Sequence, residues 1–374
     1  MDIAVITGRQ LIDDPRARLG RHERLDGIDV HRVWSTRFGR GTLMGRGIDY
    51  LSFYLGAGLA LARLCRRGDV VVAQTDPPLI SVVAGLVAKW RGAHLVNWLH
   101  DLFPEVAENL RVAFMGGVVA KVLRAMRDGS LGRARCNVVL GARMAEQLTS
   151  LGIPPERITI IHNWSDGEAI RPRPLAGHEL RRAWDVEHRF LVMYSGNMGY
   201  SHEFDTILDG AHRLRGHRDI LFLLIGGGVQ RGYIEQQVRS RGLANVQFKP
   251  YQPRETLGQS LTAANTHLVS LLPQLEGLMV PSKFYAVAAA GRPIVFIGAE
   301  DGELARLIDE GQCGFRVAPG DGQALADGIA SLTAHPEVAR RQGLAARRLF
   351  EERFHRRRAT DAWRRLLQTV ADGH

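Results

Sequence analysis

LLPQLEGLMVPSKFYAVAAAGRPIVFIG, residues 271–298, contains the structural unit that decides the fold. An apolar run ends at Pro273, and a polar loop follows. A short helix is predicted over FYAVAAA, and the β-rich run IVFIG comes next. Gly291 suits the left-handed position that follows a helix end. Strand, loop, helix and strand in this order are typical of a parallel α/β sheet.

Residues suited to binding an anion lie in the loop of this stretch. Ser282 is expected to cap the predicted helix, because its hydroxyl can accept a backbone hydrogen bond. The helix dipole disfavours Lys283 in the first turn, and an anion bound there would remove that conflict. Glu276 lies upstream in the same loop. A phosphate site is one interpretation; an ordinary connection with a solvated Lys283 and Glu276 fits the spacing equally well.

The composition indicates a globular chain with room for two domains. Its 374 residues are 45% hydrophobic and 24% charged. No apolar run approaches the roughly 20 residues of a spanning helix. The longest, at 50–64, favours a core helix, and a membrane-interface helix is the alternative. The three single cysteines form no disulfide framework and no signal peptide is recognised, so a cytoplasmic location is expected.

The charge points to an anionic partner. The formal net charge is +10 and the sequence pI is about 10.0. Nucleic acid, an anionic membrane surface and phosphorylated small molecules all fit this balance. Aromatic residues are not interleaved with the basic ones, so nucleic-acid binding is not expected. No Asp-x-Asp triplet occurs, so no metal site of that kind is predicted.

The alternation of strands and helices runs along the whole chain and divides at a charged, Pro-containing segment. We place a first domain at 1–170, a linker at 171–188 and a second domain at 189–350. A terminal helix at 351–374 is expected to cross back to the first domain. The predicted fold class is α/β, with two Rossmann-like domains facing a cleft. Ligands of such sheets bind at the carboxyl ends of strands.

Candidate site residues follow the predicted strands. His100 ends the strand at 94–101, where it is either a base or donor to a sugar, or a structural residue. Gly196, Asn197 and Gly199 follow the strand at 190–196, and glycines there allow close approach of a ligand. The remaining candidates are His202, Gly227, Pro250 and Tyr251. For each of these, an ordinary turn or a packing role is the plainer alternative.

The second half of the chain resembles the nucleotide-sugar domain of retaining family-4 glycosyltransferases with the GT-B architecture. The matching strings are VMYSGNMGYSHEFDTIL, FLLIGGG, VQFKPYQPRETL, THLVSLLPQLEGLMVPSKFYAVAAAGRP and CGFRVAPGD. In the first half, VVAQTDPPLI, NWLHDLFPEVAENL and IIHNWSDGEAIRP resemble a branch found in bacterial exopolysaccharide and O-antigen pathways. The resemblance covers nearly the whole chain.

The resemblance implies specific roles. His100 would face the donor sugar, and Glu276 matches the first acid of the family's Glu-x7-Glu motif, which contacts that sugar. Lys283 would hold the donor diphosphate together with Ser282. The backbone around Gly196, Asn197 and Gly199 would approach the diphosphate, Gly227 would lie near the nucleotide, and Pro250 and Tyr251 would meet the base.

The sequence departs from the family pattern at several positions. Ala286 stands where the family has its second Glu, which binds ribose, and Glu276 lies two residues too far from Gly291. The family's basic pair after the first strand of this half is replaced by Asn197 and His202.

The start of the chain departs as well. Residues 3–7 resemble the family's second strand, so one β-α unit of on the order of 30 residues is expected to be absent. Residues 3–7 should then not pair between the strands at 69–76 and 94–101, and residues 8–28 should form an irregular loop. We expect a polypeptide beginning at Met1 to be weakly soluble and weakly active.

The expected function is metal-independent, retaining transfer of a sugar in bacterial surface polysaccharide synthesis. The donor would be a nucleotide-diphosphate sugar, with UDP-sugar favoured, and the acceptor a glycan or a lipid-diphosphate-linked glycan. No further cofactor is expected. The basic surface favours peripheral contact with an anionic membrane. The alternatives are a nucleotide-sugar epimerase of the same architecture, or an inactive sugar-nucleotide binding protein.

Overall fold

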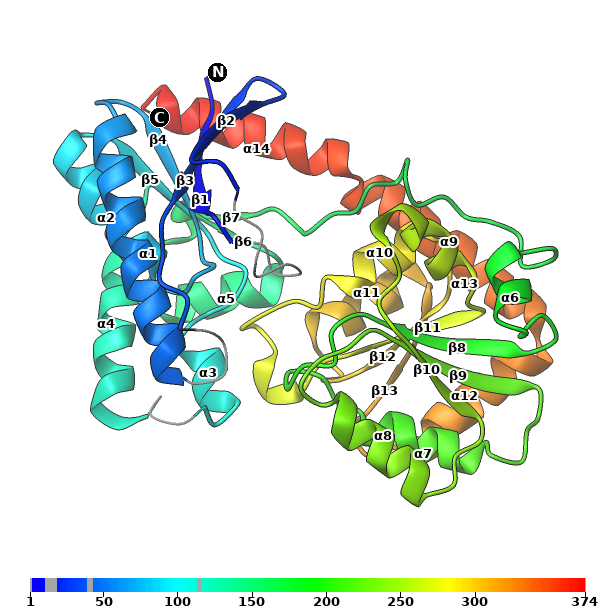
Figure 1. Cartoon of the computed structure of the whole chain (residues 1–374). Helices are drawn as coiled ribbons and strands as arrows, with labels where there is room; N and C mark the ends of the chain where they lie inside the picture. Colours follow the sequence, from blue (N-terminus) through cyan, green and yellow to red (C-terminus); the bar gives the residue numbers. More distant parts are fainter. Residues whose placement is uncertain (1, 11–18, 39–42, 113–115, 374) are drawn as a thin grey trace.

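Two α/β domains lie side by side in the computed structural model, which describes residues 2–10, 19–38, 43–112 and 116–373 (Figure 1). Their sheets are largely parallel, as the alternation of strands and helices predicts. An extended segment joins the domains, with the short helix α6 (Glu179–Ala183) near its end.

The N-terminal domain has two sheets, with strand orders β1-β3-β2 and β4-β5-β6-β7. The strands are β1 (Ala4–Gly8), β2 (His22–Leu25), β3 (Ile28–Val33), β4 (Val70–Gln74), β5 (His94–Trp98), β6 (Cys136–Val139) and β7 (Ile158–Ile160). The helices are α1 (Leu43–Leu64), α2 (Ile80–Arg91), α3 (Glu105–Asn109), α4 (Gly117–Arg133) and α5 (Ala142–Ser150).

The prediction that residues 3–7 do not pair between the strands at 69–76 and 94–101 is confirmed. β4 pairs directly with β5, from Val70 opposite His94 to Gln74 opposite Trp98, so β1 does not lie between them. β1 instead pairs in parallel with β3 in the smaller sheet.

The prediction of an irregular loop over residues 8–28 is wrong at its end. β2 pairs antiparallel with β3, and Asp26 and Gly27 connect them with φ values of 49° and 84°. An Asp-Gly pair with positive φ favours a tight hairpin, which explains the extra strand. Residues 11–18 of that predicted loop lie outside the described residues.

The prediction of a core helix at residues 50–64 holds for only one face of α1. Ala57 is buried, but Leu51, Leu55 and Leu59 are exposed. Within the described parts of the chain, no helix is both long and apolar enough to cross a membrane.

The C-terminal domain is built on a six-stranded parallel sheet of order β10-β9-β8-β11-β12-β13. All residues of β9, ILFLLI, are buried, as expected for a central strand covered on both faces. The strands are β8 (Phe190–Ser195), β9 (Ile220–Ile225), β10 (Val246–Lys249), β11 (Thr266–Ser270), β12 (Ile294–Ile297) and β13 (Gly314–Val317). The helices are α7 (Asp205–Arg213), α8 (Arg231–Ser240), α9 (Leu257–Thr262), α10 (Lys283–Ala289), α11 (Glu303–Gly311), α12 (Gly322–Ala334) and α13 (Pro336–Leu349).

The last helix, α14 (Arg356–Ala371), returns to the N-terminal domain (Figure 1). A π-helical turn, Phe350–Phe354, joins it to α13. The Trp363 ring lies 5.0 Å from the Trp98 ring at the end of β5, and the guanidinium of Arg135 donates to the carbonyl of Gly373 at 2.6 Å. These contacts attach the end of the chain to the N-terminal sheet.

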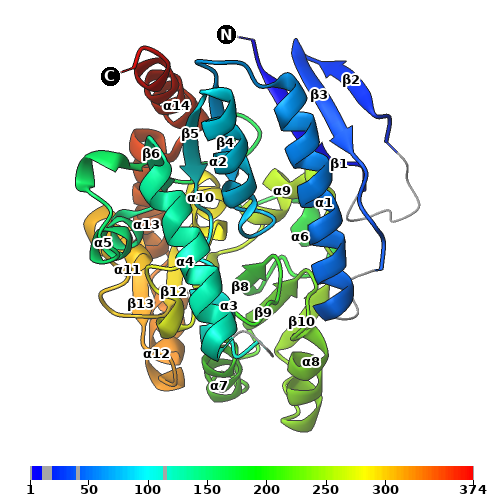
Figure 2. The same ribbon diagram turned by 90° about the vertical axis from the view of Figure 1, so that its left-hand side faces the viewer.

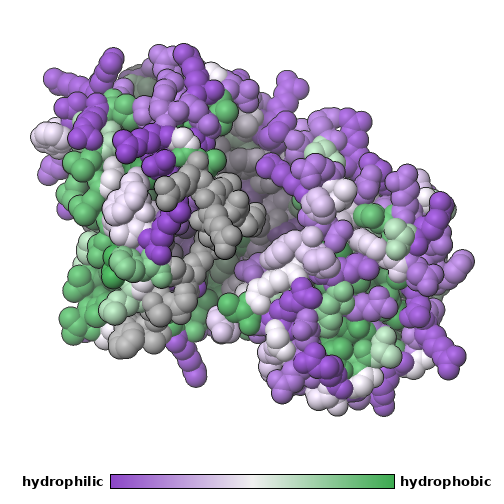
Figure 3. All heavy atoms as spheres, viewed as in Figure 1, coloured by the Kyte–Doolittle hydropathy of each residue, from purple (hydrophilic) through white to green (hydrophobic). Residues whose placement is uncertain are grey.

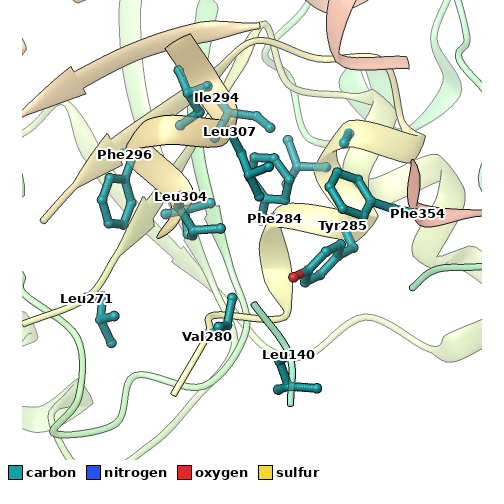
Figure 4. Packing of buried hydrophobic residues seen from close by; sticks show 14 of the residues in the cluster. Leu140, Leu271, Val280, Phe284, Tyr285, Ile294, Phe296, Leu304, Leu307 and Phe354 are labelled. Atoms are coloured by element: carbon teal, nitrogen blue, oxygen red, sulfur yellow. The ribbon is translucent and has the colours of Figure 1, made fainter. Parts of the chain in front are cut away.

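A buried apolar cluster spans the junction of the two domains. Leu140 from the N-terminal domain lies close to Val280, and Phe284, Tyr285 and Phe354 extend the cluster into the C-terminal domain (Figure 4). The backbone N–H of Leu102 donates to the carbonyl of Leu278 at 2.8 Å. The surface between the two lobes is hollowed (Figure 3).

Candidate functional site

Four loops meet at the carboxyl edge of the C-terminal sheet. They follow the neighbouring parallel strands β10, β9, β8 and β11. The last of them leads through the turn Pro273–Leu275 into α10. Because parallel strands end at the same edge, these loops bring most of the predicted site residues together.

The loops after β8 and β9 pack against each other through glycines. Gly196 has φ 139°, and a Cβ added there would lie 2.6 Å from Cε of Lys283. Gly226 has φ 130°, and a Cβ added there would overlap the carbonyl oxygen of Gly196. Glycine alone adopts such angles without strain and leaves room for these neighbours. The two loops therefore close together next to Lys283.

Lys283 is held from two sides by the protein. Its Nζ lies 2.8 Å from Nε2 of His202 and 4.9 Å from the centre of the Tyr194 ring. Burial lowers the pKa of Lys283 to about 7. Among the described residues, no carboxylate lies close enough to Lys283 to oppose this fall in its pKa. A bound anion would supply a negative partner.

His202 lies behind Lys283 and is buried. Its Nδ1 lies 2.7 Å from the carbonyl oxygen of Ser270, to which it donates, so Nε2 is free to accept a hydrogen bond from Lys283. Burial, and then the charge of Lys283, lower the pKa of His202 to about 4. A neutral His202 therefore orients the ammonium, a role that the sequence did not predict.

The Tyr251 ring covers the glycines after β9. Its Cε1 would lie 3.3 Å from a Cβ added at Gly226, and its hydroxyl donates to the carbonyl of Gly227 at 3.3 Å. Tyr251 is otherwise exposed, as is Pro250 before it. A flat apolar ring beside exposed backbone is suited to stacking against a planar group.

The remaining loop candidates differ in exposure. Asn197 is exposed and its side chain lies against Gly228, where an added Cβ would be 2.5 Å from its Oδ1. The Gly199 carbonyl is buried and accepts from Nε2 of Gln230 at 2.6 Å. Asn197 is therefore open to a ligand, whereas Gly199 supports the shape of the loop.

The prediction that Ser282 caps α10 is wrong. Ser282 has helical backbone angles, φ −64° and ψ −19°, and its hydroxyl makes no capping hydrogen bond. A capping residue needs extended angles to turn its side chain back onto the helix. The Ser282 side chain is exposed next to Lys283. The left-handed conformation predicted for Gly291 is confirmed by its φ of 64°.

The carboxylate of Glu276 is engaged within the protein. Its Oε1 accepts from the backbone N–H of Glu303, in the first turn of α11, at 2.7 Å. Burial raises the pKa of Glu276, and the hydrogen bond from Glu303 opposes that rise. Glu276 thus stabilises the start of α11, a partner that lies 27 residues further along the chain.

His100 lies on the N-terminal domain at the end of β5. Its Nε2 lies 3.2 Å from Nε2 of Gln74, and its backbone N–H donates to Oγ1 of Thr75 at 3.0 Å. Burial lowers the pKa of His100, and removal from solvent raises the pKa of the next residue, Asp101, to about 6. Asp101 also forms a backbone bridge with Met279, so His100 lies beside the loop that carries Glu276.

Two further groups at the site were not predicted. Arg231 begins α8, and its guanidinium donates to the carbonyl of Gly226 at 2.7 Å. Glu303 accepts from the backbone N–H of Arg143 across the domain junction at 3.1 Å. The position of Arg231 just after the glycine run was a usable sequence signal, whereas no local pattern links Arg143 to Glu303.

Family models match both halves of the chain. Residues 1–164 match the model described as glycosyl transferase 4-like domain. Residues 189–335 match the model described as glycosyl transferases group 1. The two models together span most of the chain and leave the linker between them.

Relatives and a solved structure agree with these matches. The chain is 26% identical over 290 residues to "Probable glycosyltransferase WbjE" of Pseudomonas aeruginosa, covering 78% of this chain and 72% of the relative. It is 28% identical over 268 residues to WcaI of Escherichia coli K12, named for glycosyl transfer in colanic acid biosynthesis, covering 68% of this chain and 64% of the relative. The structure of Anabaena HepE in complex with UDP superposes with a TM-score of 0.72 at 15% identity, covering 99% of this chain and 100% of HepE.

Proposed function

We propose that this chain, which belongs to the glycosyltransferases that combine a 4-like domain with a group 1 domain, moves a sugar from a nucleotide-diphosphate donor to a glycan or lipid-linked glycan acceptor. The observation that carries the donor part of this proposal is Lys283. Its ammonium is oriented by a neutral His202, lies beside the Gly196 loop, and has no carboxylate partner in the part of the chain that the structure describes. A diphosphate is the anion that such a site suits.

The proposed reaction retains the configuration of the sugar and needs no metal ion. The bond between the sugar C1 and the diphosphate oxygen breaks, and the diphosphate leaves with the electron pair. The acceptor hydroxyl oxygen attacks C1 from the same face and its proton passes to the departing phosphate oxygen. Lys283 stabilises the charge that develops on that oxygen. No residue of the chain needs to act as a nucleophile.

The remaining parts of the site fit the other parts of the donor. Tyr251, over the backbone of Gly226 and Gly227, would stack on the base. His100, held neutral by burial, would contact the sugar from the opposite domain. We favour UDP as the nucleotide because HepE, which shares this fold, was crystallised with UDP and with UDP-glucose.

The names of the relatives support a role in bacterial surface polysaccharide synthesis. WcaI is named for colanic acid biosynthesis, and WbjE as a glycosyltransferase. We propose that the acceptor is an intermediate of such a pathway and that the enzyme works in contact with an anionic membrane surface.

Donor screening tests the proposal. Thermal stability would be measured with UDP, GDP and their sugars, and product formation with the donor that stabilises most. Stabilisation by a nucleotide sugar, and slow release of UDP in the absence of acceptor, are the expected results. Stabilisation without any turnover would instead favour an inactive binding protein, for which Ala286 in the ribose position gives a reason. Conversion of the sugar while it stays on the nucleotide would favour an epimerase.

A further inference from the structure

The outer side of α1 exposes an apolar stripe along the whole helix. Met44 is 79% exposed, Leu51 62%, Leu55 71% and Leu59 58%, and Ile48 is exposed as well. Positions 44, 48, 51, 55 and 59 recur at intervals of three or four residues, so they share one side of the helix. Such a stripe is usually buried against another element.

The stripe continues onto the two helices beside α1. α1 packs against α2, and α2 packs against α4, so the three form one layer on the outside of the N-terminal domain (Figure 2). Apolar side chains are seen on this lobe in the space-filling view (Figure 3). The exposed apolar residues that α2 and α4 add are Leu86, Trp90, Val118, Val119, Val122 and Met126. Together with the α1 stripe they are called the apolar face.

The charges on these helices are almost all positive. Their two acidic residues are satisfied within the protein, since Asp49 accepts from the hydroxyl of Thr36 and Asp128 pairs with Arg127. The exposed basic residues on the three helices, or within three residues after them, are Arg46, Arg63, Arg66, Arg67, Lys89, Lys121, Arg133 and Arg135. One exposed acid, Asp69, follows α1 and accepts a hydrogen bond from the backbone N–H of Arg66. The face therefore combines apolar side chains with a surplus of cations.

We propose that the apolar face lies on an anionic lipid bilayer. Its apolar side chains would enter the boundary between headgroups and acyl chains, while the surrounding lysines and arginines contact anionic headgroups. Many large apolar side chains exposed on neighbouring helices mark an interaction surface in a globular protein. The positive charge around the apolar face favours a bilayer of negative surface potential over a second copy of this chain, because two positively charged faces would repel each other.

The placement of α1 relates the face to the proposed site. The hydroxyl of Tyr54 donates to the carbonyl of Pro78, which follows the carboxyl end of β4. The first turns of α1, with Met44 and Ile48, therefore extend past that edge of the sheet, the edge at which His100 lies. Docking would bring this edge to the lipid surface, where a lipid-linked acceptor is available; the docking gives a surface to the membrane contact of the proposed function and rests on it.

Vesicle flotation tests the docking. Wild-type protein would be mixed with vesicles of phosphatidylcholine alone and of phosphatidylcholine with phosphatidylglycerol. We expect binding to the anionic vesicles that weakens with added salt, and at least about tenfold weaker binding to the neutral ones. Equal binding to both, or to neither, would overturn the proposal.

Substitutions identify the surface. The triple variant Leu51→Ser, Leu55→Ser, Leu59→Ser should lose at least about tenfold in affinity for anionic vesicles, and Trp90→Gln should lose less. Leu344→Ser is the matched control, because Leu344 is 59% exposed on α13 of the other domain. Circular dichroism and nucleotide-induced stabilisation verify that each variant is folded. Unchanged vesicle binding, or a wild-type dimer in sedimentation that the triple variant dissociates, would show that lipid does not cover the face.

Discussion

At the carboxyl edge of the C-terminal sheet the side chains close on one another, whereas on the outside of α1, α2 and α4 they point into solvent. Lys283, His202 and the glycine loops are packed within hydrogen-bond or van der Waals distance. Leu51 and Leu55 on α1 are more than half exposed. A small polar ligand needs preorganised groups, whereas a broad partner needs an open surface. The two domains therefore suit different kinds of partner.

The largest effect is expected from tightening the closed edge further. In Gly226→Ala, the new Cβ would overlap the Gly196 carbonyl, and φ would remain near 130°. Backbone strain and overpacking together should lower the free energy of unfolding by about 3 kcal/mol. Urea denaturation measures this. Gly232→Ala on α8, where a Cβ meets nothing within 4 Å, is the control and should be neutral or stabilising.

Removing the charge of Lys283 should weaken donor binding and turnover strongly while leaving the fold intact. Lys283→Ala deletes the charge-assisted contact to the diphosphate, which should cost about 1.5–3 kcal/mol, or roughly 10- to 150-fold in turnover. Steady-state kinetics with the preferred donor measures the loss. Arg213→Ala, which removes an exposed guanidinium from α7, should behave as wild type. Wild-type kinetics in Lys283→Ala would remove Lys283 from the site.

The carboxylate of Glu276 holds the start of α11, and a substitution tests whether it also contacts the donor sugar. Glu276→Gln keeps an acceptor for the N–H of Glu303 but removes the charge. If the carboxylate also contacts the donor sugar, transfer should fall at least tenfold, roughly 1.4 kcal/mol. Glu255→Gln at an exposed position is the control. Unchanged transfer, or a donor complex in which Glu276 does not touch the sugar, would leave it as a helix-stabilising residue only.

The role of His202 separates positioning from direct binding. His202→Leu removes the acceptor for Lys283 and should reduce turnover about fivefold, near 1 kcal/mol, whereas His202→Gln keeps an acceptor and should recover most of it. Loss of the hydrogen bond to the ammonium should also move the alkaline limb of the pH–rate profile to lower pH. If His202→Leu and His202→Gln had the same activity and the same pH–rate profile, a positioning role of His202 would be contradicted.

The last comparison concerns stability rather than turnover. Burial lowers the pKa of Lys283 from its ordinary 10.5 to about 7, so the folded chain binds fewer protons than the unfolded chain between these values. Lysine at this position therefore destabilises the fold increasingly as the pH falls through that range. Lys283→Met should melt at a higher temperature than wild type at neutral pH. The difference in melting temperature between the variant and wild type should become smaller as the pH rises toward 10.5. A difference that does not depend on pH would show that Lys283 keeps an ordinary pKa.

The amino-acid sequence alone predicts the parts of the fold that depend on local patterns of apolar residues and glycines. Alternating apolar runs and helical periods predicted the strands of both domains except β2, and the exclusion of β1 from the larger sheet followed from its resemblance to a second strand. Gly291 was assigned its left-handed conformation because only the local chain matters there. The loops that carry Gly196, Tyr251 and Lys283 were correctly gathered at one edge, since parallel strands leave no other arrangement.

The tertiary structure alone decided which groups contact one another. His202 meets Lys283 across 81 residues of chain, and Glu276 turns to α11 across 27. Neither pairing is encoded in local spacing, because both depend on the order and register of the strands. The same holds for α1, whose apolar run predicts burial. Burial is a property of neighbours, and no described element covers the stripe of Leu51, Leu55 and Leu59.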